Sequence, residues 1–209
     1  MKPNRDFWSK IAKKYAASPI SNMDAYEATL DRVLAHMPKG ARVLELGCGT
    51  GGTALRLAKH VHSIVATDFA EGMIEQAKAR EGKQNVEFVC ADVFDPSFKD
   101  GSFDVVIGFN LFHLVEDAPR AYARIHELLV PGGLFILKSP CLGEGSLGFK
   151  FGLMKRAIPL MQWMGKAPFV RFETIANLDA DVARAGFDIV ETGNYPVRPP
   201  NHFVVAKRV

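Results

Sequence analysis

The feature that most constrains this chain is residues 43–52, where the apolar segment Val-Leu-Glu-Leu runs directly into Gly-Cys-Gly-Thr-Gly-Gly. We predict a strand that ends in a glycine-rich turn and continues into a helix. Glycine backbone can approach a ligand closely, and the first turn of a helix presents unpaired N–H groups that attract negative charge. The segment therefore predicts a binding site for a nucleotide-like ligand.

Two ligand classes fit this turn, and one acidic residue separates them. Gly47, Gly49 and Gly52 match the G-x-G-x-x-G fingerprint of dinucleotide-binding proteins. Asp68 follows at the distance where those proteins carry an acidic residue. The carboxylate of Glu45 would repel a pyrophosphate, whereas it would attract a ligand with an ammonium and a sulfonium group. S-adenosylmethionine (SAM) carries both cations and a single carboxylate, so Glu45 favours SAM.

At these residues the chain resembles the class I SAM-dependent methyltransferases, whose first motif reads acidic-x-Gly-x-Gly-x-Gly. Four residues match it position for position: Glu45, Gly47, Gly49 and Gly51. The opening segment 7–15, Phe-Trp-x-x-Ile-Ala-x-x-Tyr, is similar to small-molecule members of the family, including the ubiquinone and menaquinone biosynthesis type. The resemblance implies a Rossmann-like α/β fold with helices on both faces of a seven-stranded, mostly parallel sheet. An NAD(P)-binding oxidoreductase and a non-catalytic SAM-binding protein are the alternative functions.

Acidic residues recur at the ends of the next two predicted strands, 62–67 and 85–90. These strands end at Asp68 and near Asp92. Parallel strands joined by right-handed crossovers put their carboxyl ends on one edge of the sheet, so we expect three carboxylates in one crevice. The family resemblance implies that Glu45 lies near the methionine ammonium, Asp68 binds the ribose, and Asp92 with the Val93 backbone meets the adenine. The cofactor contacts implied in this way are Tyr15, Glu45, Gly47, Cys48, Gly49, Gly51, Asp68, Phe69, Met73, Asp92, Val93 and Asn110.

Structural interpretations of the same residues stay open. Asp68 and Glu71 have the spacing of a capping box ahead of a predicted helix over 70–80. Asp92 also fits the start of the polar loop 95–101. The aromatic side chains of segment 7–15 also fit ordinary packing within a helix over 5–17.

The two candidate catalytic residues are His113, which follows the predicted strand 103–109, and Tyr15 of the opening segment. Methyl transfer requires mainly positioning of the acceptor, with removal of a proton where the acceptor is a hydroxyl or an acidic carbon. His113 is the candidate base or orienting hydrogen-bond donor because imidazole titrates near neutrality. Tyr15 is the candidate for closing over SAM and excluding water. A structural role for His113 is the alternative.

The tetrapeptide Asn-Leu-Phe-His at 110–113 also narrows the acceptor. Methyltransferases that act on exocyclic amines of DNA bases or on glutamine amides share Asn/Asp-Pro-Pro-Tyr at this place, and the tetrapeptide departs from it. The net charge of +3 is too small to indicate a nucleic-acid partner. Both observations favour a small-molecule acceptor.

We predict one methyltransferase domain over residues 1–209. It comprises an N-terminal helical cap (1–37), a Rossmann-like core (38–140 and 172–209) and an insertion over the acceptor (141–171). The insertion is rich in aromatic residues and methionine, and its basic residues outnumber its single acid, Glu144. Such a segment suits an apolar or lipid-like acceptor, including one presented at an anionic membrane surface. Core packing or a dimer contact is the structural alternative.

Composition and the remaining periodicity complete the prediction. The three cysteines are widely spaced, so neither a disulfide framework nor a metal site is predicted, and a reduced cytoplasm is the expected setting. We see no signal peptide and no run of apolar residues long enough to span a membrane. Further helices are predicted from Ser21 and over 51–60, 117–129 and 174–185. Further strands are predicted over 134–138, 187–192 and 203–207.

Overall fold

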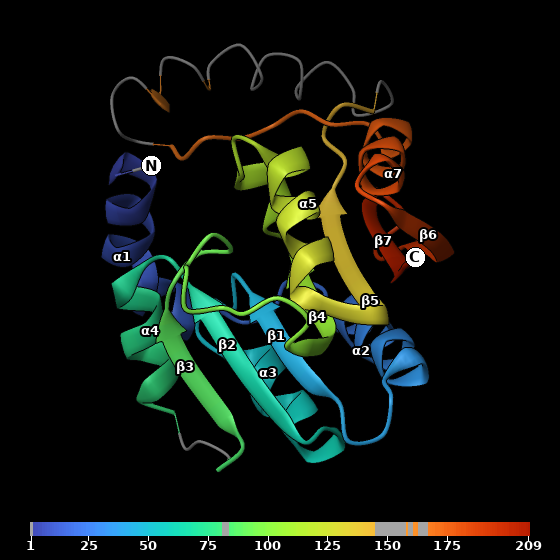
Figure 1. The fold of residues 1–209 in the computed structure, drawn as a ribbon. Coiled ribbons are helices and arrows are strands. Elements are labelled where there is room, and N and C mark those ends of the chain that lie inside the picture. The colour runs from blue at the N-terminus through green and yellow to red at the C-terminus, as the bar shows by residue number, and fades with distance from the viewer. Residues whose placement is uncertain (1, 81–83, 145–157, 159–160, 163–166) are drawn as a thin grey trace.

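The structure is a computed structural model that describes residues 2–80, 84–144, 158, 161–162 and 167–209 (Figure 1). The expectations for residues 145–157, 159–160 and 163–166, which form most of the predicted insertion, lie outside the described residues. The core predicted over 38–140 and 172–209 is described except for residues 81–83.

A seven-stranded sheet organises the chain, with the strand order β3-β2-β1-β4-β5-β7-β6. β1 pairs in parallel with β2 and β4, β2 with β3, and β4 with β5. β7 runs antiparallel between β5 and β6. The strands are β1 (Arg42–Leu46), β2 (Ser63–Asp68), β3 (Val86–Cys90), β4 (Phe103–Phe109), β5 (Leu129–Pro140), β6 (Phe187–Asn194) and β7 (Asn201–Arg208). The predicted fold class is confirmed.

Helices cover both faces of this sheet (Figure 1). They are α1 (Lys2–Ala17), α2 (Met23–His36), α3 (Gly52–Leu57), α4 (Glu71–Lys78), α5 (Ala118–Leu128) and α7 (Ile175–Arg184), with 3-10 turns η1 (Ala58–His60) and η2 (Phe112–Leu114). Tyr122 of α5 and Val182 of α7 share one apolar cluster with β1, β4 and β5. Val33 of α2 and Leu57 of α3 belong to the cluster on the opposite face.

Alternation along β1 decides where Glu45 points. Leu44 and Leu46 belong to the cluster under α5 and α7, whereas Val43 belongs to the cluster under α2 and α3. Because successive side chains of a strand point to opposite faces, Glu45 points with Val43 toward α2 and α3. The sheet therefore holds this carboxylate inside a mostly apolar layer.

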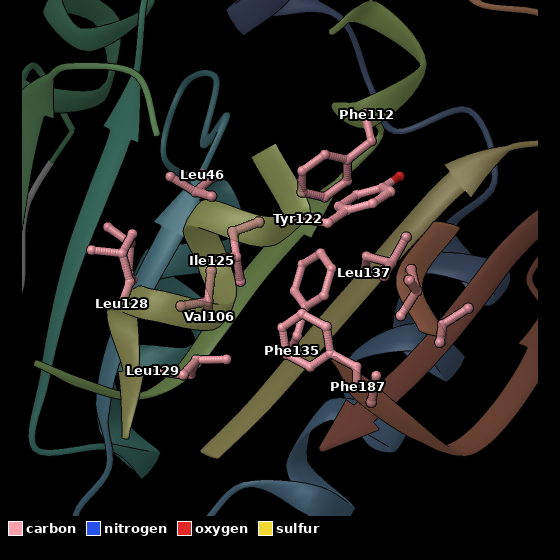
Figure 2. Close-up of a cluster of buried hydrophobic side chains, with 14 of the residues drawn as sticks. Leu46, Val106, Phe112, Tyr122, Ile125, Leu128, Leu129, Phe135, Leu137 and Phe187 are labelled. Atoms are coloured by element: carbon pink, nitrogen blue, oxygen red, sulfur yellow. The ribbon is translucent and has the colours of Figure 1, made fainter. Parts of the chain in front are cut away.

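An aromatic cluster fixes the segment that follows β4. The Phe112 ring lies 5.1 Å from the Tyr122 ring and 5.5 Å from the Phe135 ring, centroid to centroid, and Phe187 extends the cluster (Figure 2). Phe112 is only 1% exposed. Truncating a phenylalanine buried to this degree costs about 3–5 kcal/mol of stability, so the residues beside Phe112 have a well-defined position.

Several element ends differ from the sequence prediction. Asn22, not Ser21, caps α2, because the Asn22 side chain accepts a hydrogen bond from the Ala25 N–H. β5 begins at Leu129, where a helix end was predicted, and its regular pairing with β4 resumes at Leu134. The interruption has a local cause, since a proline at 131 donates no N–H and the glycine at 132 has φ +74°.

Candidate active site

The glycine turn after β1 depends on glycine for conformation and for space. Gly47, Gly49 and Gly51 have φ values of +66°, +54° and +78°. A Cβ atom on Gly51 would lie 2.6 Å from Cζ of Phe88, and one on Gly47 would lie 2.9 Å from Cδ1 of Leu111. Gly51 is also the N-cap of α3, and no side chain caps that helix. The turn therefore leaves backbone N–H groups available to an anion such as a carboxylate.

Asp68 ties the end of β2 to this turn. Its Oδ2 accepts a hydrogen bond from the Gly49 N–H at 3.0 Å, and its Oδ1 accepts one from the Ala70 N–H at 2.9 Å. The alternative interpretation as a capping box is wrong, because α4 begins at Glu71 with Ala70 as an N-cap that lacks a side-chain bond. Each oxygen of Asp68 accepts one hydrogen bond from the loops instead, which leaves further lone pairs free. Burial raises the pKa of Asp68, and the two backbone N–H groups partly offset that effect.

Glu45 is a buried carboxylate with a free oxygen. It lies one residue before the end of β1 and is 4% exposed. Its Oε2 is buried and has no hydrogen-bond partner among the described residues, while a backbone hydrogen bond from Ala54 favours its ionised form. Burial, and secondarily the charge of Asp68, raise the pKa of Glu45 to about 8. Such a group is prepared for a cationic ligand, which would both neutralise it and occupy the free oxygen.

A cavity of about 110 Å³ opens where β1 to β4 end. The predicted contacts Gly47, Phe69, Asp92 and Val93 line it. Asp92 does not end β3, which stops at Cys90; it follows in the loop, where its Oδ1 accepts a hydrogen bond from the Phe94 N–H. The cavity residues absent from the predicted contacts include Trp8, Phe94, Leu111, Val115 and Glu116. The aromatic pattern of segment 7–15 could have indicated Trp8 as a cavity residue. Leu111 lies inside the tetrapeptide 110–113, which the sequence analysis related to the acceptor.

α1 packs against α4 beside this cavity. A Cβ atom on Gly72 would lie 2.6 Å from the Ser9 carbonyl oxygen, so the backbones of the two helices meet closely. Met73 is buried in this contact with Ala12 and is not part of the cavity wall. Tyr15, 52% exposed, reaches the glycine turn, where its ring would lie 3.6 Å from a Cβ atom on Gly49. Tyr15 therefore borders the turn without enclosing it.

Asn110 stands at the end of β4 in a strained conformation. Its φ is +53°, and its N–H donates to the Lys138 carbonyl oxygen at 2.7 Å. The Asn201 side-chain N–H donates to Asn110 Oδ1 at 2.8 Å. Left-handed backbone in a residue other than glycine is a feature of functional sites held by their surroundings. Asn201 of β7 is a supporting residue that the sequence did not reveal, because the chain places it 91 positions away.

His113 lies in η2 and is not among the residues that line the cavity. Its Nδ1 is buried without a hydrogen-bond partner among the described residues, and its carbonyl oxygen accepts a hydrogen bond from the Arg171 N–H at 2.7 Å. Burial lowers the pKa of His113 to about 4. The imidazole is therefore neutral at pH 7 and a weak base, which fits an orienting hydrogen bond better than proton removal.

Cys48 completes the predicted set. It lies inside the glycine turn at 8% exposure, and burial raises the pKa of its thiol. All three cysteines are unpaired. No group of metal-binding side chains occurs within the described ranges, and within the same ranges no helix is both long and apolar enough to cross a membrane.

Comparison with known proteins decides the family. The family model described as a methyltransferase domain matches residues 43–133, which contain the glycine turn and every cavity residue except Trp8. The malonyl-[acyl-carrier protein] O-methyltransferase of Geobacter sulfurreducens is 32% identical over 190 residues, or 90% of this chain and 70% of that protein. The chain belongs to the class I SAM-dependent methyltransferases. It is an enzyme of this family with SAM as its cofactor, so the oxidoreductase alternative is excluded.

Two further comparisons agree. The demethylmenaquinone methyltransferase of Clavibacter sepedonicus is 37% identical over 120 residues, covering 56% of this chain and 48% of that protein. A SAM-dependent methyltransferase structure from Mesorhizobium loti superposes with a TM-score of 0.70 at 22% identity, covering 88% of this chain and all of that one. The Glu45 oxygen and the glycine turn independently fit a ligand that has an ammonium group and a carboxylate.

Proposed function

We propose that this methyltransferase transfers a methyl group in line to an O, N or C atom of a small, apolar or lipid-like acceptor. The observation that carries the proposal is the composition of the insertion (141–171), which is rich in aromatic residues and methionine. The 37% identity over 120 residues to a demethylmenaquinone methyltransferase supports it. The cavity at the ends of β1 to β4, which Trp8, Leu111 and Val115 line with apolar side chains, would hold the cofactor's adenine beside the acceptor.

The proposed cofactor contacts follow from the geometry of the strand ends. Glu45 Oε2 would accept a hydrogen bond from the methionine ammonium, and the glycine turn would hold the methionine carboxylate. Asp68 would bind the ribose hydroxyls through lone pairs that its two backbone donors leave free. Asp92 and the Val93 backbone would meet the adenine in the cavity. Bound SAM supplies a methyl group that its sulfonium has already activated.

The remaining predicted cofactor contacts lie in different parts of the fold and would have different roles. Phe69 lines the cavity, whereas Cys48 lies within the turn itself. Met73 packs under α1, so its proposed role is to support the position of that helix. Tyr15 and Trp8 of α1 would cover the cofactor and exclude water. Their rings lie 6.3 Å apart, edge to face, so they would move as a pair.

In this proposal the protein promotes methyl transfer mainly by positioning the acceptor and the cofactor. Phe112 is anchored in the aromatic core, so its neighbours in the 110–113 segment present a rigid edge to the acceptor. Asn110 would contact the cofactor and hold the acceptor atom in line with the methyl group. His113, neutral at pH 7, would orient the acceptor through a hydrogen bond, or accept its proton where the acceptor is acidic enough.

The test is an acceptor screen with SAM carrying a radioactive methyl group against separate pools of metabolites, lipids, nucleic acid and protein. We expect label to enter an apolar or amphiphilic pool, with no transfer in the Asp68→Ala variant used as a control. Label confined to nucleic acid or protein side chains would contradict the acceptor class. Tight binding of S-adenosylhomocysteine (SAH) without transfer to any pool would favour the non-catalytic SAM-binding alternative.

The proposal also covers the arrangement of the three parts of the chain and the protein's location in the cell. The helical cap (1–37) and the insertion (141–171) would enclose the acceptor above the Rossmann-like core (38–140 and 172–209). The insertion, with its excess of basic residues, would contact an anionic membrane surface that presents the acceptor. Three unpaired cysteines fit the reduced cytoplasm. Binding of the protein to anionic but not to neutral vesicles would support the membrane contact.

A further inference from the structure

Lys138 is a buried cation that no described residue neutralises. It lies near the end of β5, is 5% exposed, and its Nζ donates to Thr29 Oγ1 of α2 at 2.9 Å. The ammonium also lies 5.9 Å from the centroid of the Phe109 ring. Lys138 forms no ion pair within the described residues, and burial alone lowers its pKa to about 8. An ammonium has three donors, so Lys138 keeps donors available for another acceptor.

The residues outside the described ranges offer almost no counter-charge. Residues 145–166 contain no aspartate or glutamate, and the only acid among all undescribed positions is Glu81. Glu81 belongs to the link from α4 to the start of β3. β3 is separated from β5 by β2, β1 and β4, which places its axis about 19 Å away by the usual strand spacing. The chain therefore provides no carboxylate of its own for Lys138.

The position of Lys138 relates it to the acceptor. Lys138 pairs with Phe109, and its carbonyl oxygen receives the N–H of Asn110 at the end of β4. Its side chain points to the α2 face of the sheet, as the bond to Thr29 shows, and this is also the face to which Glu45 points. The ammonium thus stands beside the strand end at which the proposed acceptor meets the methyl donor.

We propose that Lys138 binds an oxyanion, a carboxylate or a phosphate, carried by the otherwise apolar acceptor. This inference rests on the proposed function, because it names one group of the acceptor. A buried charge is costly unless it is paired, and an ammonium pairs with either oxyanion as a point charge. The cofactor's carboxylate does not fill this role, since the glycine turn after β1 is placed to hold it, two strands away.

The experiment uses the whole protein saturated with SAH and three probes that share one alkyl chain: octanoate, octyl phosphate and octan-1-ol. Calorimetry gives the dissociation constant of each probe. Lys138→Met removes the charge at similar length, Lys138→Arg keeps the charge, and Lys207→Met removes an exposed lysine of β7 as a matched control. Thermal unfolding establishes that each variant is folded, and Lys138→Gln replaces the methionine variant if that variant is not.

We expect the wild type and the Lys207→Met control to bind at least one anionic probe tenfold or more tightly than octanol. Lys138→Met should lose this preference and Lys138→Arg should keep most of it. The anionic probe that binds more tightly relative to octanol, octanoate or octyl phosphate, identifies the oxyanion as a carboxylate or a phosphate. Equal binding of octanol and the anions by the wild type would overturn the inference while leaving the apolar acceptor standing. A tenfold loss of SAH affinity in Lys138→Met would also overturn it, because the cofactor would then be the partner. Binding of SAH with none of the three probes would instead refute the proposed acceptor class.

Discussion

Replacing Glu45 by glutamine should make the free protein more tolerant of alkaline pH. A carboxyl with a pKa near 8 in the folded state and 4.5 in the unfolded state favours folding most below pH 4.5. That contribution is lost as the pH rises from 4.5 through 8, because the unfolded chain ionises first. Between pH 5 and pH 9 the linkage amounts to about 4 kcal/mol. Urea unfolding of wild type and Glu45→Gln at these two pH values measures the difference.

The same substitution should weaken the cofactor site. The free enzyme must release the Glu45 proton before the carboxylate can pair with an ammonium, so wild-type affinity for SAH should rise with pH below 8. If the complex holds Glu45 ionised, the rise from pH 6 to pH 8 is about 50-fold. Glu45→Gln should show a flat profile and bind SAH with about 3 kcal/mol less free energy, since it leaves a buried ammonium without its counter-charge.

A matched control separates these effects from general surface charge. Glu75 of α4 is exposed, and Glu75→Gln should reproduce the wild type in both unfolding and calorimetric titration. The reasoning is refuted if Glu45→Gln loses stability between pH 5 and 9 in parallel with the wild type, or if it binds SAH with wild-type affinity. Saturating SAH should abolish the alkaline loss of stability in the wild type, because the bound ammonium lowers the pKa of Glu45.

Three further predictions concern neighbouring residues. Asp68→Ala should weaken SAH binding by about 1.5–3 kcal/mol for each hydrogen bond lost to the charged group, and unchanged calorimetric affinity would show that Asp68 does not bind the ribose. Gly51→Ala should cost about 2–4 kcal/mol in urea unfolding, since it combines φ +78° with a clash against Phe88, whereas Gly40→Ala, with φ +69° and open space, should cost only the backbone strain of about 1–2 kcal/mol. Equal losses of stability in Gly51→Ala and Gly40→Ala would show that the clash with Phe88 contributes nothing. His113→Ala should abolish a stability loss of about 2 kcal/mol that the wild type suffers as the pH falls from 7 to 5, because its folded pKa of about 4 lies below the ordinary 6.5. In the same variant, turnover should fall more than SAH affinity, and full turnover would return His113 to a structural role.

The sequence predicted those parts of the fold that local chemistry determines. The parallel strands β1, β2 and β3 were visible as apolar runs ending near glycine or an acid, and the crossover rule then predicted Glu45, Asp68 and Asp92 at one edge of the sheet. The helix predicted over 70–80 is present as α4, but the prediction that Asp68 caps it was wrong for a tertiary reason. The turn after β1 takes one oxygen of Asp68, and this contact with Gly49 is set by strand pairing, which spacing along the chain does not reveal.

Residues supplied by distant elements could not be predicted from patterns. Asn201 meets Asn110 only because β7 inserts between β5 and β6, and Thr29 meets Lys138 only because α2 covers that face. The sequence also gave no reason to separate Lys138 from the surface lysines. Its burial follows from the alternation of β5, which turns it toward α2 with Ile136.

A crystal structure of the protein with SAH tests the central claim most directly. We predict the homocysteine ammonium within hydrogen-bond distance, about 3 Å, of Glu45 Oε2, with the homocysteine carboxylate at the glycine turn and the adenine in the cavity beside Asp92. An ammonium bound elsewhere, with Glu45 still lacking a partner, would contradict the claim that this buried carboxylate exists to receive the cofactor's positive charge.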